Sequence, residues 1–319
     1  MDILLWCGFC LFILALLALD LGVFNRNAHV VSTREALGWT ALWVAIALAF
    51  GGAVYWLYEH HIFGVGLTVG HNLDGSDALL QYLTGYVVEK SLSLDNIFVI
   101  ALIFGYFRVP LQHQHRVLFW GVIGALVLRG AMIAAGAALI HRFEWIIYVF
   151  GIFLIGTAIR LLISDSESVE PDKNFLVRLV KRFIPVTDHY VEGKLFTRVD
   201  GRLIATPMFI VLTMVESTDV LFAVDSIPAI FAITRDPFIV FTSNVFAILG
   251  LRSLYFALAG VMDKFEYLRA SLVFLLAFIG VKMILSHHVE IPMAASLGII
   301  VGTLAVGILA SVAKAYLKK

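Results

Sequence analysis

Two apolar stretches of the chain each carry a group of oxygen-bearing side chains whose chemistry suits cation binding. The first covers residues 89–96 and the second covers residues 216–228. Their acidic and amide members are Glu89, Asp95, Asn96, Glu216, Asp219 and Asp225. One charged residue at the centre of a membrane helix costs about 2.5–3.5 kcal/mol. We therefore expect these carboxylates to face one another, a base, a cation or water, and ionisable groups at such a depth indicate an ion pathway.

The donor atoms of these residues indicate which metal ions they could bind. Carboxylate, amide, hydroxyl and backbone carbonyl oxygens are hard ligands that suit Mg, Ca or Mn. No Cys or His lies near either stretch, which disfavours Zn, Cu and Ni. Oxygen chemistry by itself leaves Mn, Ca and Mg open.

The backbone of the two stretches has features that favour a ligand role. Pro228 cannot donate a hydrogen bond to the carbonyl of Val224, so that carbonyl is left beside Asp225 as a further oxygen ligand. A proline kink without any ligand role is the alternative. Glu89 and Asp95 are six residues apart and lie on different faces of a straight helix. Their convergence on one cation requires that the helix unwinds between them.

A purely structural explanation of the carboxylates is internal ion pairing. Four basic residues at membrane depth could neutralise four of the five acids and merely hold the helices together: Lys90, Arg129, Arg252 and Lys282. Packing alone does not require acids concentrated in two stretches, so we expect ion pairing to explain only part of the set.

The elements that must position these residues are membrane helices. Of the 319 residues, 61% are hydrophobic and 14% are charged, against about a quarter charged in soluble domains. A membrane span needs about 20 mainly apolar residues. Nine stretches meet this need, at about 3–24, 38–58, 79–107, 117–140, 145–163, 207–234, 238–261, 267–286 and 292–313. The sequence thus predicts an all-α, polytopic membrane protein with a single membrane domain over residues 1–319. The net charge of zero gives no reason to expect nucleic-acid binding.

The distribution of basic residues predicts the orientation in the membrane. Nearly all Lys and Arg residues of the connections fall on one side, and Arg142 and Arg235 are the exceptions. Basic connections face the cytoplasm. We therefore expect the N-terminus outside, the C-terminus inside and the loop of about 164–206 in the cytoplasm. This loop has room for a short amphipathic helix around Phe175–Phe183 but not for a second globular domain.

A weak internal repeat divides the chain into two three-helix units, at about 79–163 and 207–286. Arg142-Phe143-Glu144-Trp145 corresponds to Lys264-Phe265-Glu266-Tyr267, and Arg160 and Lys282 follow these tetrapeptides at equal intervals. Glu89 precedes Asp95 by the interval that separates Asp219 from Asp225. A unit with an odd number of spans is inverted when it recurs, and inverted repeats are typical of secondary transporters that bind substrate near the midplane.

The same motifs resemble those of a known family. Residues 89–99 resemble the first signature of the TerC family, and residues 215–229, 236–238 and 242–252 resemble the second. The length and the cytoplasmic loop are most similar to the Alx-type members. This resemblance implies a bacterial inner-membrane protein of the LysE-like transporter superfamily, associated with manganese export and with tellurium resistance. It also implies that Glu89, Asp95, Asn96, Glu216, Asp219 and Asp225 are the functional residues.

We therefore expect export of a divalent metal ion, with manganese as the first candidate, driven by the membrane potential or a proton gradient. The metal is the transported substrate, and no cofactor is expected. Oxyanion transport, or a tellurium-resistance role without cation transport, is the alternative, with the four basic residues as its site. An intramembrane aspartyl protease is disfavoured because neither aspartate follows a Gly-x-Gly sequence. We expect no enzymatic activity, and the oligomeric state stays open.

Overall fold

The architecture is helical throughout its membrane-embedded part. The computed structural model describes residues 3–19, 32–67, 73–143, 145–163, 174–191, 193–199, 201–259, 267–286, 289 and 291–317. Its helices are α1 (Ile3–Leu19), α2 (Thr33–Glu59), α3 (Gly75–Tyr106), α4 (Leu111–Arg142), α5 (Ile146–Ile163), α6 (Phe175–Phe183), α7 (Pro207–Phe231), α8 (Pro237–Leu249), α9 (Leu251–Leu258), α10 (Leu268–Leu285) and α11 (Met293–Leu317). A short 3-10 helix, η2 (Ile62–Gly64), follows α2.

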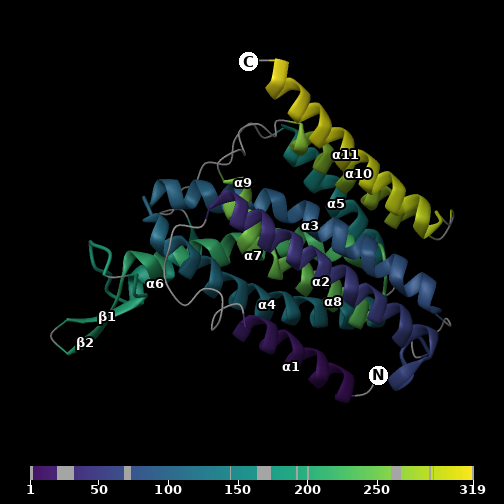
Figure 1. The fold of residues 1–319 in the computed structure, drawn as a ribbon, viewed down its shortest axis with the longest axis horizontal. Coiled ribbons are helices and arrows are strands. Elements are labelled where there is room, and N and C mark those ends of the chain that lie inside the picture. Colours follow the sequence, from purple (N-terminus) through teal and green to yellow (C-terminus); the bar gives the residue numbers. More distant parts are fainter. Residues whose placement is uncertain are drawn as a thin grey trace.

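One small β-hairpin interrupts the helical order. Strands β1 (Phe196–Val199) and β2 (Arg202–Ala205) pair antiparallel, with Phe196 opposite Ala205. The hairpin and α6 lie together at one end of the helical bundle (Figure 1). They belong to the predicted loop of about 164–206. The helix expected around Phe175–Phe183 is confirmed with those bounds, whereas the hairpin was not predicted.

Several helices are long and apolar enough to cross a membrane. The described residues contain seven such segments: Thr33–Glu59, Leu111–Arg142, Ile146–Ile163, Pro207–Phe231, Pro237–Leu258, Leu268–Leu285 and Met293–Lys314. Two further predicted spans fall outside this set. α1 has 17 residues, and the 32-residue α3 carries Glu89, Lys90 and Asp95 in its middle. The chain is thus an integral membrane protein with several spanning helices.

Side-chain caps fix where the site-bearing helices begin. The Oδ1 atom of Asp74 accepts a hydrogen bond from the backbone N–H of Asp77 at 2.8 Å, at the start of α3. Asp236 accepts one from the N–H of Phe238 at 2.9 Å and is followed by Pro237, at the start of α8. Such caps satisfy backbone donors that have no partner inside the helix.

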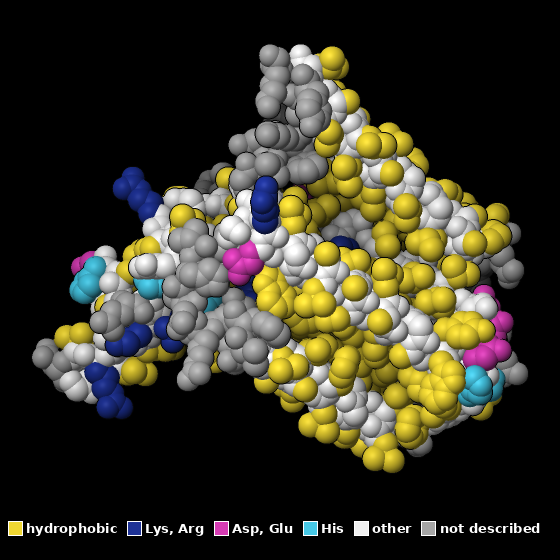
Figure 2. All heavy atoms as spheres, viewed as in Figure 1, with side chains coloured by type: hydrophobic (Ala, Val, Ile, Leu, Met, Phe, Trp, Pro, Cys, Tyr) yellow, Lys and Arg dark blue, Asp and Glu magenta, His cyan; other side chains and the backbone are white. Residues whose placement is uncertain are grey.

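The surface has the character expected of a membrane protein. On the face drawn in Figure 2, apolar side chains cover the middle of the molecule, Lys and Arg side chains lie toward the end with α6 and the hairpin, and a group of acidic and histidine side chains lies at the opposite end. The apolar band matches the part of the helices that would contact lipid.

Inside the bundle, α8 is the most enclosed of the described helices, because 11 of its 13 residues are buried. It packs against α3 and α4, while α7 packs against the same two helices. α5 and α10 pack closely on each other. Glycines permit this approach, since a Cβ atom on Gly280 would lie 2.9 Å from the carbonyl oxygen of Gly151.

The condition for Glu89 and Asp95 to converge is not met, and Pro228 does not interrupt its helix. α3 is one continuous helix from Gly75 to Tyr106, so it does not unwind between Glu89 and Asp95. α7 likewise continues through Pro228 to Phe231, so Pro228 removes one helical hydrogen bond without breaking the helix. Of the two matching tetrapeptides, residue 144 and residues 264–266 lie outside the described residues.

Candidate functional site

A cavity of about 860 Å³ opens between α3, α5, α7 and α10, and Arg129 of α4 also lines it. α3 and α5 come from the first predicted repeat, and α7 and α10 from the second. About half of the lining residues are apolar, and the others carry charged or hydrogen-bonding side chains: Glu89, Asp95, Asn96, Arg129, Thr157, Arg160, Asn174, Thr218, Asp225, Ser226 and Arg269. Asn174 lies immediately before α6, so the cavity reaches the end of the bundle that carries α6.

Arg129 of α4 organises the charges at the inner part of this cavity. Its guanidinium forms ion pairs with Glu89 of α3 and with Asp219 of α7. The distances from Nη2 to Oδ1 of Asp219 and from Nε to Oδ2 are 2.8 Å and 3.1 Å. Arg129 therefore binds the Asp219 carboxylate through two nitrogens, the geometry in which arginine recognises a carboxylate best.

Two amide side chains complete this cluster. Asn244 of α8 accepts a hydrogen bond from Nη1 of Arg129 at 3.1 Å and donates one to Oε2 of Glu89 at 3.1 Å. Asn96 donates to Oδ1 of Asp219 at 3.3 Å. Glu89, Asn96, Arg129 and Asn244 are each at most 3% exposed. The cluster is thus a buried polar network that joins α3, α4, α7 and α8, in which each charge has a partner.

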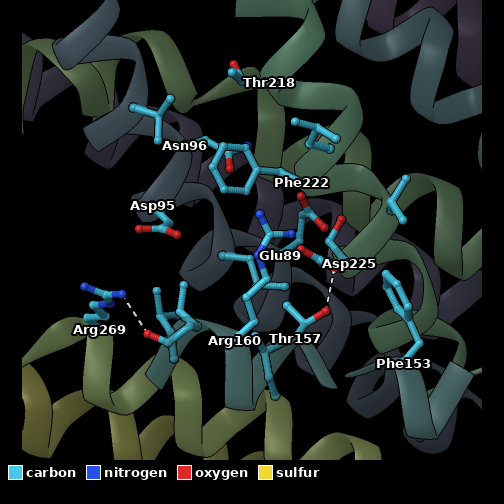
Figure 3. A pocket seen from close by; sticks show the side chains of 18 of the residues that line it. Glu89, Asp95, Asn96, Phe153, Thr157, Arg160, Thr218, Phe222, Asp225 and Arg269 are labelled. Atoms are coloured by element: carbon cyan, nitrogen blue, oxygen red, sulfur yellow. Dashed lines mark hydrogen bonds between the residues drawn. The ribbon is translucent and has the colours of Figure 1, made fainter. Parts of the chain in front are cut away.

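Asp95 and Asp225 have different surroundings. Both are half-buried and line the cavity, and Figure 3 shows their carboxylates on opposite sides of it, with Glu89 between them in this view. Oδ1 of Asp225 accepts a hydrogen bond from the hydroxyl of Thr157 at 2.9 Å. Among the described residues, the ion pairs within 4 Å are those of Arg129, and Asp95 and Asp225 take part in neither. These two carboxylates are the ones that a solute in the cavity can reach.

Glu216 lies apart from the cavity lining. Its Oε2 atom is buried without a hydrogen-bond partner. The carboxylate fits against Gly124 of α4, where an added Cβ atom would lie 2.0 Å from Oε1. Oδ1 of Asn96 is also buried without a partner. Buried oxygens of this kind are rare and are ready acceptors for a cation.

The six predicted ligands thus occupy three environments. The Arg129 cluster contains Glu89, Asn96 and Asp219. The cavity is faced by Asp95 and Asp225. Glu216 belongs to neither and lies against Gly124. In this arrangement, no group of three or more His, Cys, Asp and Glu side chains among the described residues could hold a metal ion.

The ion-pairing explanation accounts for two of the five carboxylates. Arg129 pairs with Glu89 and Asp219, as that explanation requires. Lys90 instead donates to the carbonyl oxygen of Ala247 at 3.1 Å, and Lys282 donates to Oγ of Ser296 at 2.8 Å.

Four residues of the site were not among the predicted ligands. Asn244 lies inside the second motif. A polar amide within an apolar helix could have indicated that this residue belongs to the site. Arg160 was noted only for its interval in the repeat. Arg269 lines the cavity from the first turn of α10 and donates to the carbonyl oxygen of Leu161 at 2.7 Å. Nothing in the sequence distinguishes Thr157 from other membrane threonines.

Comparison with known proteins places these residues in a wider group. Residues 74–319 match the family described as "Integral membrane protein TerC family". STKORF319, an uncharacterized membrane protein of Myxococcus xanthus, is 51% identical over 310 residues, which cover 97% of this chain and 92% of that protein. Alx of Escherichia coli K12, provisionally named a membrane-bound redox modulator, is 46% identical over 303 residues, covering 94% of this chain and 92% of Alx. No solved structure matches.

Proposed function

Because the chain belongs to the TerC family of integral membrane proteins, we propose that it exports a divalent cation, with manganese as the first candidate, across the bacterial inner membrane. The observation that carries this proposal is the cavity between α3, α5, α7 and α10, into which Asp95 and Asp225 present carboxylates from two helices. A hard divalent ion binds mainly through carboxylate charge and other oxygens, and both are available there.

In this proposal the cation first enters the cavity from the end that carries α6 and meets Asp95 and Asp225. The hydroxyl of Thr157 and the backbone carbonyl of Val224, which has no helical donor because of Pro228, add neutral oxygens nearby. The apolar remainder of the lining lowers the local dielectric and strengthens the attraction of the two carboxylates for a cation.

In this proposal Arg129 balances the charge of two buried carboxylates. It neutralises Glu89 and Asp219 while the cavity is empty of metal, which avoids the cost of buried unpaired carboxylates. Movement of the cation deeper would require that Glu89 and Asp219 exchange Arg129 for the metal. The buried oxygens of Glu216 and Asn96 are further acceptors along that route.

The packing of the helices supports the proposed inverted repeat. A two-fold relation between α3–α5 and α7–α10 pairs the contact of α3 with α8 to a contact of α4 with α7, and it permits α5 to contact its counterpart α10. All three contacts occur. Glu89 and Asp219, which correspond in the repeat, share Arg129, and Asp95 and Asp225 share the cavity.

With α1 and α3 added to the seven clear spans, the proposed topology has nine spans in a single membrane domain, with the N-terminus outside and the C-terminus in the cytoplasm. The basic end of the molecule in Figure 2 would then be cytoplasmic. The protein would act as a transporter rather than an enzyme, in contact with the lipid bilayer and its metal substrate.

The test is transport into inverted membrane vesicles with Mn, Ca, Mg and Zn offered separately. We expect uptake of manganese that depends on an energised membrane, and at most slow uptake of zinc, because the donors are oxygens. Equal vesicles without the protein serve as the control. No uptake of any divalent ion by energised vesicles that contain the protein would contradict the proposal.

Anion transport is the second candidate, and the basic side chains of the cavity favour it. Arg129, Arg160 and Arg269 all line the cavity, so its charge is close to balanced. The variants Arg160→Gln and Arg269→Gln distinguish the two candidate functions. Transport of manganese and of tellurite is measured for each variant. A transporter of oxyanions loses tellurite transport in these variants, whereas a cation transporter retains manganese uptake.

The description of Alx raises a redox role as well. The chain has two cysteines, and Cys7 and Cys10 are free and exposed on α1. A variant with both replaced by serine should transport manganese at the normal rate, and loss of transport would favour thiol chemistry.

A further inference from the structure

Helix α6 carries apolar side chains that the rest of the described protein leaves uncovered. Its sequence Phe175–Phe183 contains six apolar and three basic residues. Its two terminal rings are well exposed, because Phe175 is 67% exposed and Phe183 is 73% exposed. In a water-soluble loop such a helix would bury these rings.

Only one flank of the apolar face packs on protein. Val177 is fully buried and Val180 is partly buried against the cluster formed by the ends of α3, α4 and α7. At 100° per residue, Phe175, Leu179 and Phe183 form a strip on the helix surface beside Val177 and Val180. This strip does not face the cluster on which those two residues pack. Leu179 is 41% exposed on that strip.

The basic side chains form the opposite border of the same strip. On the side of the strip away from Val177 and Val180, the helix carries Arg178, Lys181 and Arg182, and all three are exposed. Arg178 and Arg182 are four residues apart and therefore lie on one face. An exposed apolar strip bordered by a basic face is the pattern of helices that lie in the membrane interface.

The position of α6 places this pattern at a membrane surface. Tyr190, which follows α6, donates to the carbonyl oxygen of Phe107 at the end of α3 at 2.7 Å. Asn174 caps α6 through the N–H of Val177 at 3.1 Å and donates to Oγ of Ser217 in α7 at 2.7 Å. α6 is thus fixed at the end of the spanning helices, where headgroups meet the bundle (Figure 1).

We propose that α6 is an interfacial helix that binds the anionic lipid headgroups of the leaflet at its end of the molecule. Phe175, Leu179 and Phe183 insert among the acyl chains, and Arg178, Lys181 and Arg182 contact lipid phosphates. Charge complementarity and continuity with the lipid-facing apolar band select a bilayer as the occupant. Because Asn174 also lines the cavity, lipid binding by α6 positions one residue of the cavity mouth.

The inference rests on the membrane location of the chain and not on the transported substrate. The test therefore needs no transport assay. The full chain, with Cys7→Ser and Cys10→Ser, carries a nitroxide label at Leu179→Cys and is reconstituted into vesicles of phosphatidylcholine with or without phosphatidylglycerol. A second labelled variant, Phe183→Cys, covers the case that the first folds poorly. Leu203→Cys on β2, which is 60% exposed, is the control on the nearby hairpin.

Collision of the label with oxygen reports lipid, and collision with a water-soluble nickel complex reports solvent. We expect the labels on α6 to collide with oxygen and to lose collision with nickel, while the label at residue 203 collides with nickel. Phosphatidylglycerol should move the labels on α6 further from solvent. Collision with nickel at residues 179 and 183 equal to that at residue 203 would overturn the proposal.

The contribution of the basic side chains of α6 to lipid binding is tested with two matched pairs of substitutions. Arg178→Gln combined with Arg182→Gln should abolish the response of the label to phosphatidylglycerol. Arg198→Gln combined with Arg202→Gln removes two charges from the hairpin and should leave the response unchanged. An unchanged response in the first pair, or equal loss in both pairs, would show that α6 does not recognise anionic headgroups.

Discussion

At the scale of single residues, Arg129 is the group on which the largest number of buried contacts converges. It binds two carboxylates, Oγ of Ser226 and the amide of Asn244. Removing one partner of a buried pair typically costs about 3–5 kcal/mol, because the other charge is left buried without compensation.

Arg129→Gln should therefore lower the amount of folded protein in the membrane and its thermal stability in detergent. Glu89→Gln with Asp219→Asn in the same chain removes the stranded charges and should restore much of that stability, as followed by fluorescence-detected size-exclusion chromatography after heating. Failure of the triple variant to recover would mean that Arg129 stabilises the protein through packing rather than charge.

Asp225→Asn tests the cavity carboxylates. It preserves size and hydrogen bonding while removing the charge that binds a divalent ion. Metal uptake should nearly vanish and the amount of protein in the membrane should hold, since Asp225 belongs to no ion pair within 4 Å among the described residues. Asp95→Asn should behave alike. Uptake and abundance must be measured on the same membranes, and full uptake by an abundant Asp225→Asn protein would remove this residue from the mechanism.

Glu216 is tested through its neighbour. In Gly124→Ala, the new methyl group would occupy the position of the Glu216 carboxylate, 2.0 Å from Oε1. The side chain must move, and if it is a metal ligand, uptake should fall several-fold without loss of abundance. Gly121→Ala on the same helix is the matched control, because its Cβ atom would approach Val215 at an ordinary 3.4 Å. Equal uptake by both variants would separate Glu216 from the function.

At the scale of elements, α5 and α10 pack directly on each other beside the cavity. Both helices contribute lining residues, and Gly151 and Gly280 leave no room for a Cβ atom between them. Close helix contact in membranes depends on such small residues.

Gly280→Ala should push α5 and α10 apart, because its Cβ atom would meet the carbonyl oxygen of Gly151 at 2.9 Å. Overpacking of this kind costs about 1–3 kcal/mol, so the apparent Tm in detergent should fall by several degrees. Gly156→Ala in α5, where nothing lies within 4 Å, should leave the apparent Tm unchanged. A normal Tm for the first variant would show that the two helices can separate freely.

At the scale of the whole molecule, the distribution of Lys and Arg between the two ends predicts the direction of insertion. A reporter fused after residue 200 should be cytoplasmic, and one placed near Gly64 should be outside, because basic connections are retained in the cytoplasm. Activity of paired alkaline phosphatase and fluorescent-protein fusions measures this directly. A residue-200 fusion with external activity would contradict the proposed orientation of the loop of about 164–206.

Properties that depend on local composition could be read from the amino-acid sequence. Apolar stretches long enough to cross a bilayer must form helices, because the bilayer offers no other hydrogen-bond partner to the backbone. The bounds of α6 likewise followed from its short amphipathic pattern. The acidic residues of α3 and α7 were recognisable because ionisable groups are rare at membrane depth.

The division of the carboxylates between the Arg129 cluster and the cavity becomes evident only from the packing of the helices. Glu89 and Asp219 are 130 residues apart in sequence, and their common partner Arg129 becomes evident only when α3, α4 and α7 pack together. The sequence left open whether α3 unwinds, which was the condition for Glu89 and Asp95 to meet at one point. The straight helix instead directs Glu89 to Arg129 and Asp95 to the cavity. Charge pairing between distant helices is a property of packing, which composition and periodicity do not encode.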